Sequence, residues 1–445
     1  MKAKSNRLSG FLRQFTLFAG LGVLFLAGVL LNVPDKPDGE NVFLRIGNQR
    51  QVLEQVSING TLAVGMTLVI ITAGIDLSVG SVLSLCSVVC AMLLMQQPVE
   101  DYEWLSRAHA IMLPAVFLFT ALAGFGLTRR VFKWSLKAAI PATGLLGFIA
   151  VWVALGCPFQ LAPAVKFSTL GVLLTVPLVG GMLGMTSGVI IAKTRLQPFI
   201  VTLAMMISAV GLAKFIAGDG GRVHSIYIES GEQAGAPASF AALGEPIVTV
   251  GERTLRTGKV HDVKLIPIPG LFMLGCWTLA AILLTKYPFG RYIYAVGGSE
   301  ETSRLAGIPV DRVKIFVYTT SGVLAGLAAV LFCAKYKQGL ATAGQMKELD
   351  AIAAVVIGGT SLMGGRGSIL GTLVGIMIFG YLTNILNLEG VSSEIQDIVK
   401  GVIIVGAAVL QSGELFGGLR WLRRRRPSVG APASANTADR QGVHV

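Results

Sequence analysis

The sequence predicts an all-α polytopic membrane protein with about twelve transmembrane helices, and three observations support that fold class. Of the 445 residues, 53% are apolar and only 14% are charged, and the mean hydropathy is +0.70. A soluble domain carries about a quarter charged residues. The apolar residues fall in runs of roughly 17–22, the length of a membrane-crossing helix. Basic residues at the ends of these runs account for the net charge of +13, so we expect membrane lipid and no nucleic acid as a partner.

The N-terminal part is predicted to hold three helices. Basic residues in a cytoplasmic segment, 1–14, precede an apolar run at 15–33, which predicts an uncleaved first helix and opens the transmembrane domain, 15–411. A cleaved signal peptide is the alternative, but no small-residue cleavage site follows the run. Residues 33–54 are polar and are interpreted as an external loop. Further helices are predicted at 56–73 and 81–96.

Residues 101–167 are interpreted as an inserted helix pair. Helices at 111–127 and 138–155 are joined by residues 128–137, whose four basic side chains place that loop inside. The next helix, 170–192, carries Gly180, Gly184 and Gly188 at a spacing typical of close helix packing, although ordinary glycine frequency is the alternative. A helix at 197–217 leads out to a periplasmic loop, 218–269, in which residues from Ile247 onward suggest either a small hairpin or a disordered loop.

The C-terminal half begins with a helix at 271–285 and a basic cytoplasmic loop at 286–314. Helices at 315–333, 351–363, 368–386 and 398–410 follow, and Gly367, Gly371 and Gly375 form a second packing stripe. Arginines 420 and 423–426 place the tail, 412–445, in the cytoplasm, where its polar residues predict disorder. Both termini are therefore predicted to be cytoplasmic.

Two glycine-rich breaks interrupt the apolar pattern, at residues 72–80 and 358–370. Asp76 in the first break would be costly in hydrocarbon, so we expect it in protein, in a water-lined cavity or at the interface. Residues 80–83 and 367–370 align, which predicts an internal repeat, parallel because both breaks follow inward-running helices. We interpret both breaks as the wall or gate of a transport pathway; for Asp76 the alternative is a structural carboxylate. The pathway residues are Gly74, Asp76, Ser78, Gly80, Gly359, Thr360, Ser361, Gly364 and Gly365.

Enzymatic chemistry is not predicted. Residues 359–364 have the first glycine spacing of a phosphate-binding loop, but Gly365 and Arg366 replace the required Lys-Ser/Thr pair. No catalytic residues and no metal ligands are identifiable: the cysteines lie in or beside apolar segments without histidine or carboxylate neighbours, and the histidines lie outside the apolar runs. We therefore expect no cofactor on this chain.

A second informative stretch lies in the cytoplasmic loop, at residues 291–309. Ser299 is predicted to cap a short helix whose first turn holds Glu300 and Glu301, and Gly307 is predicted to end it. A solvated surface helix is the plain alternative. A short rigid helix with apolar residues such as Ile308 is also typical of a segment that docks into a partner's groove.

Three motifs together carry a family resemblance: TAGIDLSVGS at 72–81, GRYIYAVGGSEETSRLAGI at 290–308 and ELDAIAAVVIGGTSLMGGRGSILGTLVG at 348–375. They resemble ABC-importer permeases of the ribose/galactose/xylose class, within the branched-chain amino acid permease superfamily, over 56–95 and most of 170–411. Such permeases have about ten helices, so residues 101–167 would be an addition. Their cytoplasmic coupling helix is matched by Glu301 and Gly307, with Thr302 and Ser303 where alanines are usual.

The resemblance implies a monosaccharide permease dimer in a bacterial inner membrane. Its expected partners are an ATPase subunit with two nucleotide-binding domains, which binds ATP and magnesium, and a periplasmic sugar-binding protein. Permeases for branched-chain amino acids, autoinducer or nucleosides remain alternatives. An ion-coupled transporter is less well supported, because the predicted helices largely lack central ionisable residues. The residues expected to couple to the ATPase are Gly298, Glu300, Glu301, Arg304, Gly307 and Ile308.

Overall fold

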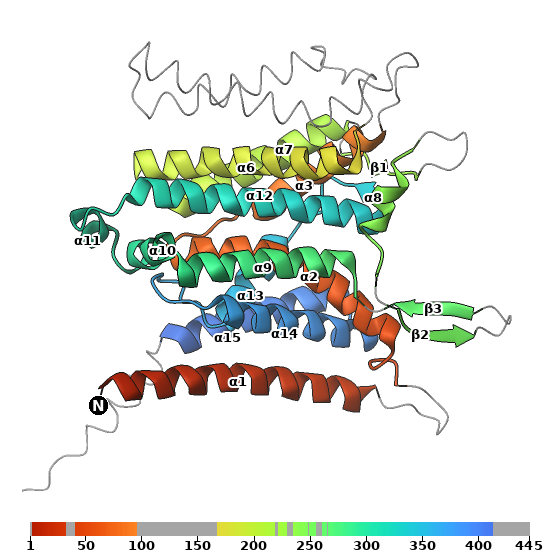
Figure 1. Ribbon diagram of the computed structural model, residues 1–445, viewed down its shortest axis with the longest axis horizontal. Coiled ribbons are helices and arrows are strands. Elements are labelled where there is room, and N and C mark those ends of the chain that lie inside the picture. Colours follow the sequence, from red (N-terminus) through yellow and green to blue (C-terminus); the bar gives the residue numbers. More distant parts are fainter. Residues whose placement is uncertain are drawn as a thin grey trace, which may run out of the picture.

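The computed structural model describes residues 2–32, 41–95, 167–218, 221–228, 235–247, 249–254, 260–264 and 266–412. This part of the chain is a bundle of roughly aligned helices (Figure 1). Six of the described helices are long and apolar enough to cross a membrane. The chain is therefore a polytopic helical protein. The predicted helix pair falls on residues outside the described part, apart from Phe167, as does the tail after Ser412, so the count of twelve remains a prediction.

The longer of the described helices are α1 (Lys2–Leu31), α2 (Ile46–Ile71), α3 (Val79–Met95), α6 (Thr169–Thr194), α7 (Pro198–Ala217), α9 (Ile268–Lys286), α12 (Val310–Tyr336), α14 (Ile369–Leu388) and α15 (Ser393–Ser412). The shorter ones are α8 (Ala238–Ala242), α10 (Pro288–Gly298), α11 (Glu300–Leu305) and α13 (Lys347–Ile357). Long helices run along the bundle, whereas the short α10 and α11 lie at one of its ends and the short α8 and the strands at the other (Figure 1).

Two small antiparallel sheets lie at the end of the bundle opposite α10 and α11 (Figure 1). One pairs β1 (His224–Ser225) with β4 (Gln338–Gly339), and the other pairs β2 (Thr249–Thr254) with β3 (Val260–Lys264). The second sheet confirms the predicted hairpin. We call this the strand end of the molecule, and the opposite end, with α10 and α11, the coupling end.

Helices α2 and α12 form the centre of the bundle. In the most apolar 18-residue stretch of α2, 94% of the residues are buried within the protein. Helix α12 lies against α6 at backbone distance, because Gly180 and Gly184 of α6 face Gly322 of α12 with no room for a Cβ between them. Gly371 and Gly375 of α14 approach the backbone of α13 in the same way. The first predicted glycine stripe is confirmed. The second is confirmed for Gly371 and Gly375, whereas Gly367 precedes α14 and lies against the side chains of Thr360 and Ile71.

The prediction of an external loop at 33–54 is wrong from residue 46 onward, because α2 begins there. Its polar residues are paired instead of solvated: Glu54, only 8% exposed, bonds Lys335 of α12 at 2.9 Å. Asn48 exchanges two hydrogen bonds with Asn384 of α14, at 3.0 and 2.7 Å. The first helix also begins earlier than predicted, at Lys2, so the basic residues that were expected to precede the helix lie within it.

The predicted helix at 351–363 is also wrong in its bounds. Helix α13 has 11 residues and ends at Ile357; at 1.5 Å per residue it is about 16 Å long, too short to cross a bilayer. Its continuation is blocked by glycines in left-handed conformations, Gly359, Gly364 and Gly365, with φ of +84°, +81° and +67°. Gly80 lies inside α3 whereas Gly367 precedes α14, so the aligned residues occupy different places in their helices. The repeat remains a prediction.

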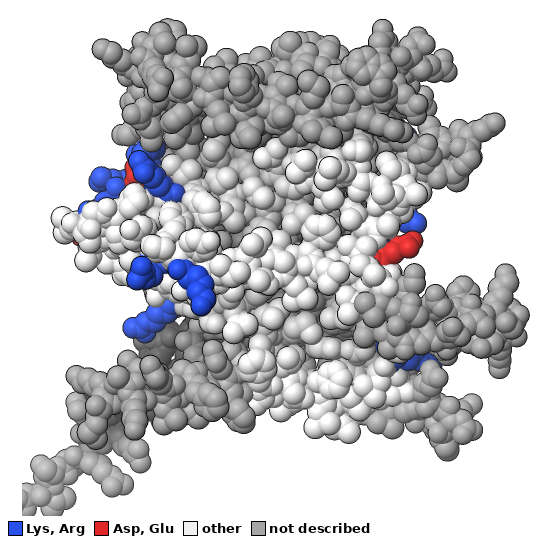
Figure 2. Space-filling view, viewed as in Figure 1, with Lys and Arg blue, Asp and Glu red and all other residues white. Residues whose placement is uncertain are grey.

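Charge is distributed along the bundle as its membrane-like composition predicts. Figure 2 shows Lys and Arg side chains gathered toward the coupling end, whereas the middle of the visible described surface carries no charge. Helix α1 also begins at the coupling end (Figure 1). An uncharged belt between two polar ends is the surface that a lipid bilayer requires.

Candidate functional site

The first glycine-rich break connects α2 to α3, and Asp76 is buried within it. Asp76 is 1% exposed. Its Oδ1 accepts hydrogen bonds from the amide and the hydroxyl of Ser78, at 3.0 and 2.6 Å, and its Oδ2 accepts one from the Ser321 hydroxyl on α12, at 2.8 Å. All three donors are protein groups, so the hydrogen bonds of this buried carboxylate are made within the fold. Asp76 therefore shapes its own turn and fixes the break to the centre of α12, so it lies in protein, one of the three environments expected for it.

We predict that Asp76→Ala costs about 1–3 kcal/mol of stability, because it leaves three buried donors without an acceptor. Asp76→Asn keeps one accepting oxygen and is expected to cost less. Thermal unfolding of the purified protein measures both. An Asp76→Ala protein as stable as the parent but unable to transport would show that the carboxylate acts on the transported solute instead.

The other residues of this break make close backbone contacts. A Cβ on Gly74 would meet the Tyr318 hydroxyl, and one on Gly80 would meet the carbonyl of Gly344 in the loop before α13. Ser78 is 2% exposed. Gly80, Ser78 and Asp76 therefore lie in the interior of this chain, and Gly74 lies on the wall of the cavity described below.

The second break follows α13 and forms a compact loop. Thr360 is fully buried, and the Ser361 amide donates a hydrogen bond to the Arg366 carbonyl at 2.9 Å. The Gly364 amide bonds back to the Ser361 carbonyl at 3.0 Å. Met363 at the tip is 87% exposed. The loop is thus internally hydrogen-bonded and carries an apolar side chain on its outer surface.

Helices α10 and α11 form the predicted capped segment. The Ser299 side chain accepts a hydrogen bond from the Thr302 amide at 3.2 Å, which confirms the predicted N-cap. Gly307 has φ +79°, and the following amide, of Ile308, bonds the Ser303 carbonyl at 3.0 Å, which confirms the predicted C-terminal end. Leu305 is 85% exposed, and Glu301 and Gly298 are also exposed.

A chain of ion pairs fixes α11 to α12 and α6. Glu300 bonds Lys314 at 2.6 Å and Arg304 at 3.0 Å, Arg304 bonds Asp311 at 3.0 Å, and Asp311 bonds Lys193 at 2.6 Å. Partial burial works to raise the pKa of Glu300, but the hydrogen bonds and charges of Lys314 and Arg304 hold that pKa below its ordinary value. Of the two predicted glutamates, Glu300 positions α11 and Glu301 is left facing outward.

The two breaks and α10 meet at one point, which we call the joint and define as residues 71–74, 296–298 and 364–365. The Gly365 amide donates a hydrogen bond to the Ile71 carbonyl at 2.9 Å. Gly297 lies against both of these backbone groups with no room for a Cβ. The Tyr294 hydroxyl of α10 bonds the Gly367 carbonyl at 3.1 Å. The structure thus brings the predicted pathway residues and the predicted coupling segment into direct backbone contact.

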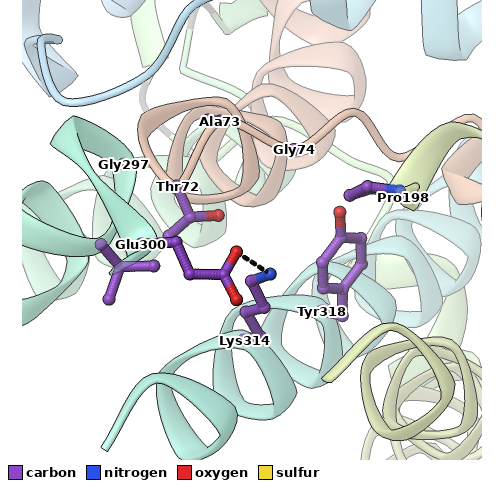
Figure 3. Close-up of a pocket in the computed structure, with 9 residues that line it drawn as sticks. Thr72, Ala73, Gly74, Pro198, Gly297, Glu300, Lys314 and Tyr318 are labelled. Carbon is purple, nitrogen blue, oxygen red and sulfur yellow. Dashed lines mark hydrogen bonds and ion pairs between the residues drawn. The ribbon is translucent and has the colours of Figure 1, made fainter. Parts of the chain in front are cut away.

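A cavity of about 160 Å³ opens beside the joint (Figure 3). It lies between the residues that follow α2, the end of α10, the start of α11, the start of α7 and the first half of α12, so it belongs to the coupling end. Its lining residues are Thr72, Ala73, Gly74, Pro198, Val296, Gly297, Glu300, Lys314 and Tyr318.

Sequence reasoning missed a second set of charges inside the bundle. Besides the Glu54–Lys335 pair, Lys347 at the start of α13 bonds the Asn59 side chain at 3.0 Å, and Asp350 lies 3.5 Å from Lys400 of α15. The signal was the charged run at 347–350 directly before an apolar stretch of sequence. The expectation of few central charges is therefore too simple. Among the described residues, no three His, Cys, Asp or Glu side chains gather closely enough to hold a metal ion.

Comparisons with known proteins agree with the motifs. The family model described as "Branched-chain amino acid transport system / permease component" matches residues 49–162 and 159–408. The ribose import permease protein RbsC of Escherichia coli K12 is 35% identical over 371 residues, 83% of this chain and 87% of the relative. The xylose transport system permease protein XylH of the same strain is 31% identical over 382 residues, 84% and 86% of the two chains.

A further relative is similar to more of the chain. The ribose import permease protein RbsC of Bacillus subtilis is 33% identical over 407 residues, 92% of this chain and 95% of the relative. No solved structure matches the chain. With two matched segments that span most of the sequence and six described helices fit to cross a membrane, this chain is a multi-pass inner-membrane protein and belongs to the family of branched-chain amino acid transport system permease components.

Proposed function

We propose that this chain is the permease subunit of an ATP-binding-cassette importer that carries a monosaccharide of the ribose/xylose kind. The similarity to ribose and xylose permeases over more than four-fifths of both chains carries the proposal. The chain provides the passage, and ATP is hydrolysed on a partner ATPase subunit with two nucleotide-binding domains.

We place the ATPase subunit at the coupling end. Leu305 and Met363 expose apolar side chains there, 85% and 87% respectively, and Glu301 is also exposed. A rigid helix that offers one apolar and one acidic side chain suits a groove on a partner. The basic residues at this end favour a cytoplasmic position, which would also hold the start of α1 (Figures 1 and 2).

The joint is the proposed route by which movement of α10 and α11 reaches the pathway. Its three segments share backbone contacts, so α10 cannot shift without displacing the end of α2 or the loop after α13. If the coupling end is cytoplasmic, the strand end lies on the periplasmic side, where it would face a sugar-binding protein. A second permease copy and the inserted helix pair complete the proposed transporter of about twelve helices per chain.

Transport assays on proteoliposomes test the function. We expect uptake of radiolabelled ribose or xylose only when the ATPase subunit, the binding protein and ATP are all present. Unlabelled ribose, galactose and xylose should compete, and leucine should not. Leucine uptake would assign the chain to the amino acid branch of the family, and uptake driven by an ion gradient without the ATPase would refute the proposal.

Glu301 tests the docking site by itself. We expect Glu301→Lys to weaken co-purification of the ATPase subunit about ten-fold, since a charge reversal at an interface commonly costs more than 1.4 kcal/mol. The folded permease should keep its stability, because Glu301 lies outside the ion-pair chain. Glu389→Lys, an exposed glutamate between α14 and α15, is the matched control and should retain the ATPase. Equal retention by both variants would move the docking site away from α11.

A further inference from the structure

The cavity beside the joint contains a buried hydroxyl without a partner. Tyr318 of α12 is 0% exposed, and its Oη makes no hydrogen bond among the described residues. Figure 3 shows this hydroxyl pointing toward Gly74 and Pro198 on the cavity wall. Leaving a buried hydroxyl unsatisfied costs about 1–3 kcal/mol, and such groups in native proteins commonly face a ligand or water.

The backbone at the rim of the cavity is strained as well. Ala73 has φ +60°, a left-handed conformation that costs a residue with a Cβ about 1–2 kcal/mol. The strain is held in place by hydrogen bonds from the Ala73 amide to the Ile70 carbonyl, at 2.9 Å, and from the Gly74 amide to the Val69 carbonyl, at 3.1 Å. Strained residues are concentrated at binding sites and switches. This second observation points to the same cavity.

The lining favours a neutral ligand with several hydroxyl groups. The two charged residues of the lining, Glu300 and Lys314, are paired with each other at 2.6 Å, so the cavity offers little net charge to an ion. Thr72 donates its hydroxyl to the Val69 carbonyl at 2.7 Å and keeps lone pairs as acceptors. Val296 and Pro198 supply apolar surface. Polar groups on some sides and apolar faces on others match the hydroxyls and C–H faces of a sugar ring.

The size of the cavity limits the ligand to one ring. A closed cavity of about 150 Å³ holds a benzene-sized molecule. At about 160 Å³, and partly open, this cavity has room for a single monosaccharide and not for an oligosaccharide.

We propose that this cavity is a low-affinity monosaccharide site at the coupling end, in which Tyr318 donates a hydrogen bond to a sugar hydroxyl. The proposal rests on the proposed function and adds a site to it. Because the lining includes the residues after α2, the end of α10 and the start of α11, a bound sugar holds the joint in the arrangement seen here. Sugar accumulated on the ATPase side therefore slows further cycles, so the importer senses its own product.

The test measures sugar binding to the complete transporter in lipid nanodiscs without the binding protein, using radiolabelled ribose and xylose at millimolar concentrations. Tyr318→Phe removes one hydroxyl that has no bond within the described chain, and we expect it to weaken binding about five- to ten-fold. Ser187→Ala is the matched control, because the Ser187 hydroxyl on α6 is equally buried and unpartnered in the described residues but does not line the cavity. It should bind sugar as the parent does.

A second measurement follows ATP hydrolysis stimulated by the binding protein while sugar is added on the ATPase side. The concentration that halves the rate should rise about five- to ten-fold in Tyr318→Phe and stay unchanged in Ser187→Ala. Equal binding by Tyr318→Phe and the parent overturns the inference. So does absence of binding by a parent transporter that imports sugar, and in that case the proposed function stands. A transporter that imports neither sugar overturns both.

Discussion

Replacing Gly297 with alanine is expected to abolish sugar-stimulated ATP hydrolysis and to destabilise the permease by more than the roughly 1–3 kcal/mol of an ordinary overpacked site. The added Cβ would overlap the Ile71 carbonyl and lie 2.6 Å from the Gly365 amide nitrogen. Both are backbone atoms of other segments, so no flexible side chain can move aside. The hydrogen bond of 2.9 Å between these two groups would have to break.

The neighbouring glycine provides the control for this prediction. A Cβ on Gly298 would meet nothing within 4 Å, and that residue is exposed. Gly298→Ala leaves the backbone of the joint in place, so it should stay within about 0.5 kcal/mol of the parent and keep its ATPase coupling. Thermal unfolding in detergent and ATP hydrolysis by the reconstituted complex measure both variants. Wild-type uptake by Gly297→Ala would show that the joint can separate without loss of function.

The contrast between these two glycines shows what local sequence can predict. The cap at Ser299, the end at Gly307 and the glycine stripes at four-residue spacing all depend on neighbours within one or two helical turns. The structure confirms each of them except the place of Gly367, which precedes its helix. Nothing within that distance separates Gly297 from Gly298, because the atoms that exclude a Cβ belong to Ile71 and Gly365.

The errors have the same origin. Residues 46–54 resemble a loop because they are polar, yet Glu54 and Asn48 find partners in α12 and α14, more than 280 positions later in the chain. Helix α13 begins before the apolar run, since Lys347 and Asp350 are accommodated by Asn59 and Lys400. A polar residue signals a loop only where no partner is available, and availability is a property of the fold.

Reversing the charge of Glu300 is the other change from which we expect a large effect. Glu300→Lys would place three cations together, because Lys314 and Arg304 both bond this carboxylate. The side chain of Glu300 is 39% exposed, so the expected cost of about 1–2 kcal/mol lies between those of exposed and buried pairs. Helix α11 would detach from α12, and ATPase coupling should fall at least ten-fold. Glu301→Lys, by contrast, should weaken ATPase docking without lowering the unfolding temperature.

The pH dependence separates an ion-pair role of Glu300 from a purely steric one. Because the folded-state pKa of Glu300 is held below its ordinary value, its ionised form stabilises the fold above the ordinary glutamate pKa, and this contribution is lost as the pH falls through the lowered value. Glu300→Gln keeps the shape and removes the charge. Its unfolding temperature should lie below that of the parent at neutral pH and converge with it in acid. A difference that stays constant down to acidic pH would mean that α11 is held by packing and not by charge.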